Sequence, residues 1–450
     1  MSRTRRVAHT RSPRLPVAVV VVVLATLFGI PSAAAASTGT LVINSNTTLT
    51  ENHFGPTVIS ADHVILDCAG HTLSGPGFAG ILLDGRTGVT IRNCQVTNFT
   101  HGVLLINSSG NKLIENRAIH NDESGFAVVL GSDENQVSDN QASFNGLIGF
   151  LLDGDGNIAD GNLSTDNGDA GFVLGVNSTD TSLVRNTSNA NGNAGFRFDD
   201  AVGNAATDNS ATSNRNAGFL LLNAAGNSLI GNSSQSNALD GFRLSFSDDN
   251  QLSDNSASKN GTIGFALEGD RNVVIGNQAT SNADAGFVLG IDAVNTTLVD
   301  NAALDNGHAG YRFDGAAGNT ARDNSAIGNT AEGFVLSGAP DNSLVRNTAL
   351  SNGTSGFAVV DGSNNTVMIG STSSNNGIHG IVVEGSSHNR LQGNIVQANG
   401  DAGVALFNAS SFNRLTRNSG CGNASFDAID DLTGVDNVWS NNRFCTSSGI

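Results

Sequence analysis

Six acidic residues occupy one position of a short motif that recurs along the chain. Each follows the second apolar residue after a glycine: Asp84, Asp153, Asp199, Glu268, Asp314 and Glu384. Paired carboxylates serve glycoside hydrolases as general acid, general base or nucleophile. Asp153 and Asp199 are two repeats apart, or about 9.6 Å at roughly 4.8 Å per repeat, which is near the outer limit for an inverting pair. Asp200 adds a third candidate catalytic carboxylate.

Arginines accompany these carboxylates. The sequence Arg-Phe-Asp at 197–199 returns at 312–314, and Arg243 has the same place in a repeat between them. Two copies of a cluster suit linked weak binding sites better than a single catalytic centre. The candidate binding residues are therefore Arg197, Asp199, Arg243, Arg312 and Asp314. The alternative is that these residues form only the solvated face of an acidic protein.

The histidines show no metal-binding pattern. His101 and His379 share a repeat position, but twelve repeats separate them, or about 58 Å. A zinc ion needs its ligands about 2 Å away, so these two histidines cannot share one. No Ser-His-Asp set, phosphate-binding loop or dinucleotide motif occurs in the sequence. We therefore expect neither a metal site nor a cofactor.

A motif of about 23 residues repeats through most of the chain. A glycine followed by an apolar residue recurs fifteen times from Gly80 to Gly403, at spacings of 22 to 24 residues. Apolar residues alternate after each glycine, as at Phe242 and Leu244, which is the period of a β-strand. Two further short strands follow in each copy. Repeats of this length are typical of solenoids, and parallel crossovers are right-handed. The sequence predicts an all-β, right-handed parallel β-helix of about fifteen coils with three strands each.

The repeats also predict the core. One column of stacked inward rings is expected from Phe126, Phe150, Phe172, Phe196, Phe219, Phe242, Phe265 and Phe287. Asparagines recur at the corners between strands. Asparagine tolerates left-handed backbone and bonds to nearby main chain, and stacked amides can bond to one another. We therefore assign the corner asparagines a structural role.

The two ends depart from the repeat. Residues 1–36 combine five arginines, an apolar run from Val17 to Ile30 and a string of alanines, which is typical of a secretory signal peptide. The run has 14 residues, too short for a comfortable membrane span. We expect a first coil and cap at 37–79, regular coils at 80–424, and a last irregular coil with a cap at 425–450.

Acidic charge narrows the range of partners. The formal net charge is −18, and loss of the five arginines of residues 1–36 gives −18 − 5 = −23. Such a surface disfavours nucleic acid and anionic membranes. We expect a monomer that is secreted, or held in the periplasm or at the cell surface, with no nucleic-acid partner and no membrane contact after signal cleavage.

Four cysteines in an exported protein indicate two disulfides, and four cysteines allow three pairings. The repeat register selects one pairing. Cys68 lies one coil before Cys94, and Cys421 and Cys445 each follow a corner asparagine by three residues. Stacked neighbours about 4.8 Å apart are within the Cα separation of a disulfide. We predict Cys68–Cys94 near the first coils and Cys421–Cys445 near the last.

From about Leu41 to Cys445 the chain resembles the right-handed β-helix repeat proteins of the pectin-lyase-like superfamily. Residues 63–75 are similar to their usual first coil. The Asn-x-x-x-Gly-Phe repeats resemble those of NosD-type copper-accessory proteins and of carbohydrate-binding and sugar-hydrolysing β-helices. The resemblance implies a secreted β-helix with a polysaccharide ligand. The sequence lacks the Asp-Pro-His-Asp run of alginate epimerases, the combination of Asp-Asp with Gly-His-Gly of polygalacturonases, and a ligand cluster for copper.

Three functions follow from these observations. We expect a side face that binds a glycan or another surface polymer without catalysis. The first alternative is a polysaccharide lyase or glycoside hydrolase that uses Asp153, Arg197, Asp199 and Asp200, and the second is a purely structural or adhesive rod. Exposed aromatic rings often accompany sugar sites, whereas the only tyrosine and tryptophan, Tyr311 and Trp439, are at inward positions.

Overall fold

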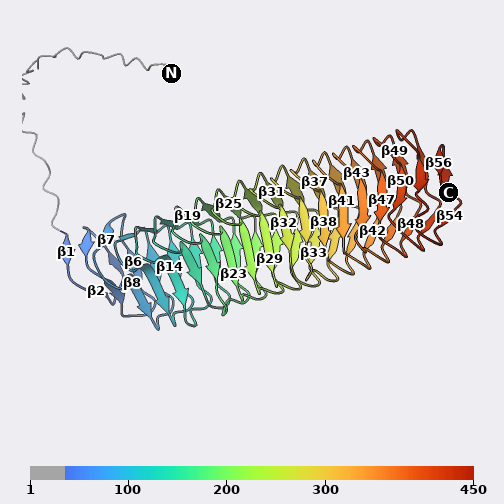
Figure 1. Ribbon diagram of the computed structural model, residues 1–450. Coiled ribbons are helices and arrows are strands. Elements are labelled where there is room, and N and C mark those ends of the chain that lie inside the picture. The colour runs from blue at the N-terminus through green and yellow to red at the C-terminus, as the bar shows by residue number, and fades with distance from the viewer. Residues whose placement is uncertain (1–35) are drawn as a thin grey trace, which may run out of the picture. The chain divides into compact units, whose positions relative to one another are not determined.

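The computed structural model describes residues 36–450, which form one parallel β-helix (Figure 1). The predicted signal peptide, residues 1–36, falls almost wholly outside the described residues. All 56 elements of the described part are short strands. This part of the chain contains no helix with the length and apolar character needed to cross a membrane.

Three parallel sheets run along the solenoid. Sheet A extends from β1 (Ser37–Thr38) to β55 (Arg443–Phe444), sheet B from β2 (Leu41–Ile43) to β56 (Ser447–Ser448), and sheet C from β3 (Thr47–Thr48) to β54 (Val438–Ser440). One strand of each sheet makes a coil, as in β29 (Phe242–Ser245), β30 (Gln251–Ser253) and β31 (Ser256–Ser258). Each pairs in parallel with its counterpart in the next coil. The predicted fold and the three strands per coil are confirmed.

The solenoid continues beyond the fifteen predicted repeats. The fifteen glycines mark the sheet B strands from β8 (Ala79–Asp84) to β50 (Val404–Phe407). Sheet B also contains β2 and β5 (Thr57–Ile59) before them, and β53 (Ala428–Asp430) and β56 after them. These four strands lack the glycine-apolar motif, so the motif alone undercounts the coils. Residues 37–79 supply β1 to β7 (Thr72–Ser74) and the start of β8.

The predicted ring column fills the core under sheet B. It contains the eight predicted phenylalanines, from Phe126 to Phe287, and continues through Tyr311, Phe334 and Phe357. Neighbouring ring centroids are 4.4 to 4.9 Å apart, and all the rings are at most 1% exposed. Because each ring buries a large apolar area and every ring between the two ends stacks on two others, this column is a principal source of the stability of the solenoid.

Buried asparagines form hydrogen-bonded ladders at the three corners. Asn232, 1% exposed, donates from Nδ2 to Asn255 Oδ1 (3.0 Å) and to the carbonyl of Ala206 (2.8 Å). Its Oδ1 accepts the backbone N–H and the Nδ2 of Asn209 at 2.9 and 3.0 Å. The amide is therefore fully used within the fold, which confirms the structural role of these residues.

The repeated glycine is a steric requirement of these ladders. A Cβ atom at Gly241 would lie 2.5 Å from the carbonyl oxygen of Gly264 and 2.9 Å from Asn260 Nδ2. Real Cβ atoms do not approach other atoms so closely. The glycine therefore lets the strand of sheet B pass directly over the adjoining ladder.

Both predicted disulfides are present. Cys68 is bonded to Cys94 with a Cα separation of 4.7 Å, and Cys421 is bonded to Cys445 with a separation of 5.2 Å. Each bond joins neighbouring coils near one end of the solenoid. The register of the repeat was therefore sufficient to select the pairing.

Candidate functional site

The outward face of sheet B carries an apolar row interrupted by three arginines. Eighteen residues in register, from Val42 to Ile429, occupy the central outward position of successive strands. All are aliphatic except Arg197, Arg243 and Arg312. A sheet face that meets solvent is normally polar. Of the aliphatic members of the row only Val42 is exposed, and the others are buried or half-buried. The row is therefore a shallow apolar floor with a few charged groups, a combination typical of ligand sites.

A groove of about 380 Å³ lies over this row between Arg243 and Arg312. Its floor is formed by Ala266 of β32 (Phe265–Leu267) and Val288 of β35 (Phe287–Leu289), each 8% exposed. The arginines belong to β29 and to β38 (Tyr311–Asp314). They are three coils apart, or about 14 Å. The groove is also lined by residues that precede the strands, namely Leu239, Thr262 and Asp284. Asp314 at the end of β38, and Glu268 and Gly290 directly after β32 and β35, line its other side.

Arg312 is held in place by two carboxylates. Its Nε donates to Asp314 Oδ2 at 2.8 Å within the same strand. Its Nη1 lies 3.2 Å from Asp284 Oδ2, which precedes the strand of the preceding coil. The Arg312 side chain is 24% exposed. It therefore remains accessible while its orientation is fixed by two ion pairs.

Arg243 is less constrained at the other end of the groove. Its Nη1 lies 3.6 Å from Asp240 Oδ2 and its Nε donates to Ser245 Oγ at 3.2 Å. Ser245 in turn donates to Glu268 Oε2 at 3.3 Å. The side chain of Arg243 is 42% exposed. This end of the groove therefore presents a more accessible cation next to an acidic group.

Arg197 repeats the arrangement of Arg312 five coils earlier. Its Nε donates to Asp199 Oδ2 at 2.8 Å and its Nη1 to Asp169 Oδ2 at 2.9 Å. The structure therefore joins the predicted residues Arg197 and Asp199, and likewise Arg312 and Asp314. The carboxylates of the preceding coil, Asp169 and Asp284, were missed by the sequence argument, because only the register shows that they meet these arginines.

Asp199 differs from its counterpart in electrostatics. Burial raises its pKa above the ordinary value, an effect that Arg197 partly opposes and that Asp169 and Asp200 reinforce. Its Oδ1 is buried and has no hydrogen-bond partner among the described residues. Asp314 is 46% exposed, and Gly315 stands where Asp200 follows Asp199. Only the first copy therefore combines a half-buried carboxyl group with a raised pKa, a combination that favours general acid chemistry.

The other catalytic candidates have separate partners. Asp153 accepts hydrogen bonds from the backbone N–H and the Nδ2 of Asn177, at 2.8 and 3.0 Å. Asp200 is exposed and has a positive φ of 54°. The structure therefore does not connect Asp153 to Asp199 by a hydrogen bond, and it leaves Asp200 at a turn.

Exposed phenylalanines provide a feature that the sequence argument overlooked. Phe246 follows β29 at a positive φ of 50° and is 66% exposed. With Ile291 and three aspartates it lines a second groove of about 440 Å³: Asp248, Asp270 and Asp292. The interpretation of the sequence considered only tyrosine and tryptophan as exposed rings. The signal was a phenylalanine placed after the strand, outside the inward column.

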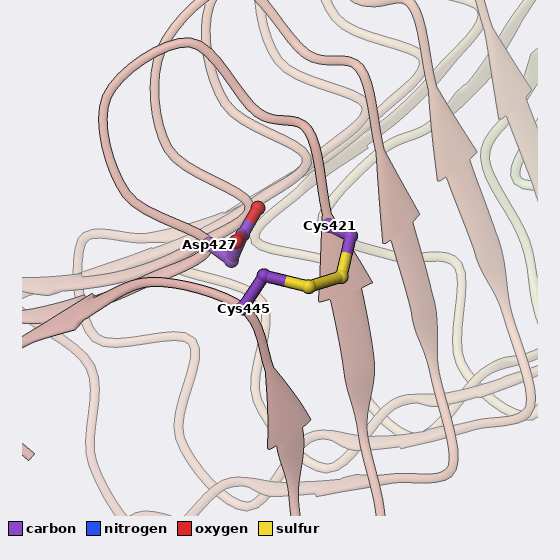
Figure 2. Close-up of side chains that lie close together, drawn as sticks. All are labelled: Cys421, Asp427 and Cys445. Carbon is purple, nitrogen blue, oxygen red and sulfur yellow. A yellow bond between two sulfur atoms is a disulfide. The ribbon is translucent and has the colours of Figure 1, made fainter.

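One group of potential metal ligands occurs in the described part of the chain. Cys421 of β52 (Ser419–Cys421), Asp427 and Cys445 have ligand atoms within 4.8 Å of one another, and Figure 2 shows the two sulfur atoms bonded to each other. Asp427 accepts hydrogen bonds from Asn423 and Thr446. The carboxylate thus takes the place of the next asparagine and ends one corner ladder.

Two families match the sequence. The one described as "Right handed beta helix region" matches residues 79–234 and 221–349. The one described as "Periplasmic copper-binding protein (NosD)" matches residues 290–447. No curated protein matches the chain.

Solved structures show distant likeness. The periplasmic alginate epimerase AlgG is 11% identical, with a TM-score of 0.32, over 79% of this chain and 76% of that chain. The A-module of the Azotobacter vinelandii mannuronan C-5 epimerase AlgE6 is 15% identical, with a TM-score of 0.31, over 86% and 92%. The Dettilon tailspike protein is 14% identical, with a TM-score of 0.36, over 75% and 59%. Likeness at this level carries no argument about function.

The described residues do not fit a copper site. Copper is held by imidazole, thiolate or thioether ligands that converge on one ion. The sulfur atoms of Cys421 and Cys445 are joined in a disulfide, and a disulfide offers no thiolate. Met368 is fully buried, and His379 is paired with Asp401 at 3.6 Å. We therefore derive no chemistry through copper.

Proposed function

Because this chain belongs to the right-handed β-helix family, we propose that it is an exported β-helix whose sheet B groove binds a glycan or another surface polymer without catalysis. The groove between Arg243 and Arg312 carries the proposal. Ligand sites typically combine apolar lining with a few placed polar groups. A sugar ring presents both an apolar face and hydroxyl groups, which matches that combination.

The apolar floor and the charged groups of the groove match the apolar face and the hydroxyl groups of a sugar. Ala266 and Val288 provide an apolar floor for a ring face. Arg312, fixed by Asp284 and Asp314, provides oriented donors, and the carboxylates provide acceptors for hydroxyl groups. Groups that are ordered before binding lose less entropy when the ligand arrives.

The form of the row favours a polymer over a small molecule. The aliphatic positions continue past both ends of the groove, to Leu220 on one side and Val335 on the other. A chain of sugars could therefore extend along the solenoid and contact several coils. The second Arg-Asp cluster, at Arg197 and Asp199, lies further along the same row.

The carboxylates of the groove are poorly suited to catalysis. A general acid or base must reach the proton that it transfers at hydrogen-bond distance, whereas these carboxylates already have partners within the protein. Asp284 and Asp314 both contact Arg312, and Glu268 accepts from Ser245. These contacts support binding without turnover.

Export and the expected partners rest on independent features. Two disulfides support an oxidising compartment, in agreement with the signal-like residues 1–36. The net charge of −18, or −18 − 5 = −23 without residues 1–36, argues against nucleic acid and anionic membranes. A neutral polymer, or one with cationic groups, suits this surface. A monomeric state remains a prediction.

A glycan array tests this proposal, followed by reducing-sugar and unsaturated-product assays on each polymer that binds. Arg312→Ala should weaken binding about tenfold, which corresponds to roughly 1.4 kcal/mol. The matched control is Arg346→Ala, which removes an arginine paired with Asp323 at 2.7 Å beside sheet C. That variant should bind normally. If the wild-type protein binds no polymer, the proposal fails in favour of a structural rod.

A hydrolase or lyase is the second candidate, and Asp199 favours it. The raised pKa of Asp199 and its unpartnered Oδ1 are features expected of a general acid. Turnover that is lost in Asp199→Asn and retained in Asp314→Asn would support an enzyme. Binding with no detectable product in either variant or in the wild type would support the binding function.

A further inference from the structure

Three arginines converge near the C-terminal end of sheet C. Arg390 begins β48 (Arg390–Gln392), Arg414 begins β51 (Arg414–Thr416), and the two are direct partners in the parallel register. Arg417 follows β51 immediately. All three side chains are exposed, and they line one pocket of about 510 Å³. This pocket belongs to a different sheet from the groove described above.

The pocket contains no carboxylate. Its remaining lining residues are Gln392, Thr416, Ser440 and Asn441. None of the three arginines forms an ion pair within residues 36–450. Acidic residues outnumber basic ones 40 to 22 in the whole sequence. Three neighbouring arginines without an acidic partner are therefore an exception to the charge pattern of this chain.

A corner arginine elsewhere shows what is missing. Arg346 follows its sheet C strand as Arg417 does, and donates to Asp323 of the preceding coil at 2.7 Å through both Nε and Nη2. In the coil before Arg417, the equivalent corner residue is Gly393. Arg417 therefore has no carboxylate from the preceding coil beside it. The guanidinium of Arg417 is available to another anion.

The register also places two like charges directly opposite each other. Arg390 and Arg414 are adjacent in the outward row of sheet C, and like charges in such positions repel. The preceding member of the row is Val367 and the following one is Val438, so neither neighbour offsets the repulsion. A bound anion between the two guanidinium groups would remove it.

We propose that this pocket binds a tetrahedral oxyanion, a phosphate or sulfate group that is either free or carried on a polymer. Guanidinium forks match the oxygen geometry of such groups and bind them in a bidentate manner. Three positive charges favour a dianion over a monocarboxylate, because the attraction grows with the charge of the ligand. The hydroxyl groups of Thr416 and Ser440 and the Nδ2 of Asn441 offer additional neutral donors. Gln392 Oε1 accepts a hydrogen bond from Arg390 Nη2 and so helps to orient that guanidinium.

Titration calorimetry of the mature protein at low ionic strength tests this site with inorganic phosphate, sulfate and acetate. Phosphate and sulfate should bind saturably, and acetate at least about tenfold more weakly, because it brings one charge instead of two. Arg414→Gln should lower phosphate affinity at least about tenfold, the loss expected when charge-assisted hydrogen bonds are removed. The same titration with polyphosphate and with dextran sulfate distinguishes a polymer from a free anion. Affinity per anionic group above that of the free anion identifies a polymer, and equal affinity identifies the free anion.

The matched control is Lys112→Gln. Lys112 begins β12 (Lys112–Ile114) and occupies the same outward row of sheet C as Arg414, far from the pocket. The substitution removes the same charge, so phosphate affinity should not change. The proposal is overturned if neither phosphate nor sulfate binds the wild type saturably, if acetate binds as well as phosphate, or if Lys112→Gln and Arg414→Gln lose equal affinity. None of these outcomes depends on the sheet B groove.

Discussion

Removal of one asparagine from a corner ladder should have a large and specific cost. Asn232→Ala eliminates the two hydrogen bonds that its Nδ2 donates, to Asn255 and Ala206, and the two that its Oδ1 accepts from Asn209. The site is 1% exposed, so water does not readily replace these partners. The backbone N–H of Asn209 is left without its acceptor.

The magnitude follows from the number of bonds. A buried hydrogen bond contributes about 0.5–1.5 kcal/mol net, so four give about 2–6 kcal/mol. Asn232→Ser should be milder by about 1 kcal/mol, because a hydroxyl can still accept from the Asn209 N–H. The same ladder already contains this substitution: Ser371 Oγ accepts the N–H of Asn347 at 3.3 Å.

Urea unfolding followed by far-ultraviolet circular dichroism measures the series, and amide hydrogen exchange reports locally on Asn209. Exchange at that amide should accelerate in Asn232→Ala. The control is Ser233→Ala, at the adjacent exposed position, for which a change within about 0.5 kcal/mol is expected. If Asn232→Ala is no less stable than Ser233→Ala, the ladder is not a source of stability and the reasoning is refuted.

Three further predictions concern other parts of the solenoid. Tyr311→Phe should stabilise the protein by about 1–2 kcal/mol in equilibrium unfolding, because the buried hydroxyl has no hydrogen-bond partner among the described residues; a loss of stability would contradict this. Burial would raise the pKa of Asp427, but hydrogen bonds from Asn423 and Thr446 outweigh it and lower that pKa below 3.8. Its contribution to stability is therefore present above pH 3.8 and lost as the pH falls through the folded-state pKa. Asp427→Asn should lower the melting temperature at neutral pH and flatten its decline in acid, and an unchanged pH profile would argue against this role. Arg197→Ala and Arg312→Ala should each weaken polymer binding partly and more strongly together, as measured by affinity electrophoresis, whereas a complete loss from either alone would exclude linked sites.

The repeat made most of the fold predictable. Each glycine of the motif lies within or directly before a strand of sheet B, and at Gly241 and most of its equivalents the absent Cβ leaves room for an asparagine amide. The disulfides were predictable for the same reason, because stacking fixes which cysteines are neighbours. The end coils were not counted, since strands such as β5 and β53 pair normally but lack the glycine-apolar signature.

The candidate site was only partly predictable. Arg312 and Asp314 are close in sequence, so their contact could be expected, whereas Asp284 joins them from the preceding coil. The apolar row on the outward face of sheet B consists of residues that can be identified in the sequence. An alternating pattern of strand residues nevertheless leads one to expect apolar residues in the interior and polar residues outside. Leu220 faces outward and is still only 7% exposed, because long side chains of the neighbouring coils flank it at strand spacing.

Hydroxyl-radical footprinting of the wild-type protein, with and without the polymer that binds best on the array, tests the central claim most directly. The account predicts protection of the residues that line the sheet B groove, with Arg312 and the exposed Leu239 among the most protected, and recovery of the polymer at its original length. Protection confined to sheets A and C, or a polymer shortened during the incubation, would contradict a non-catalytic binding groove on sheet B.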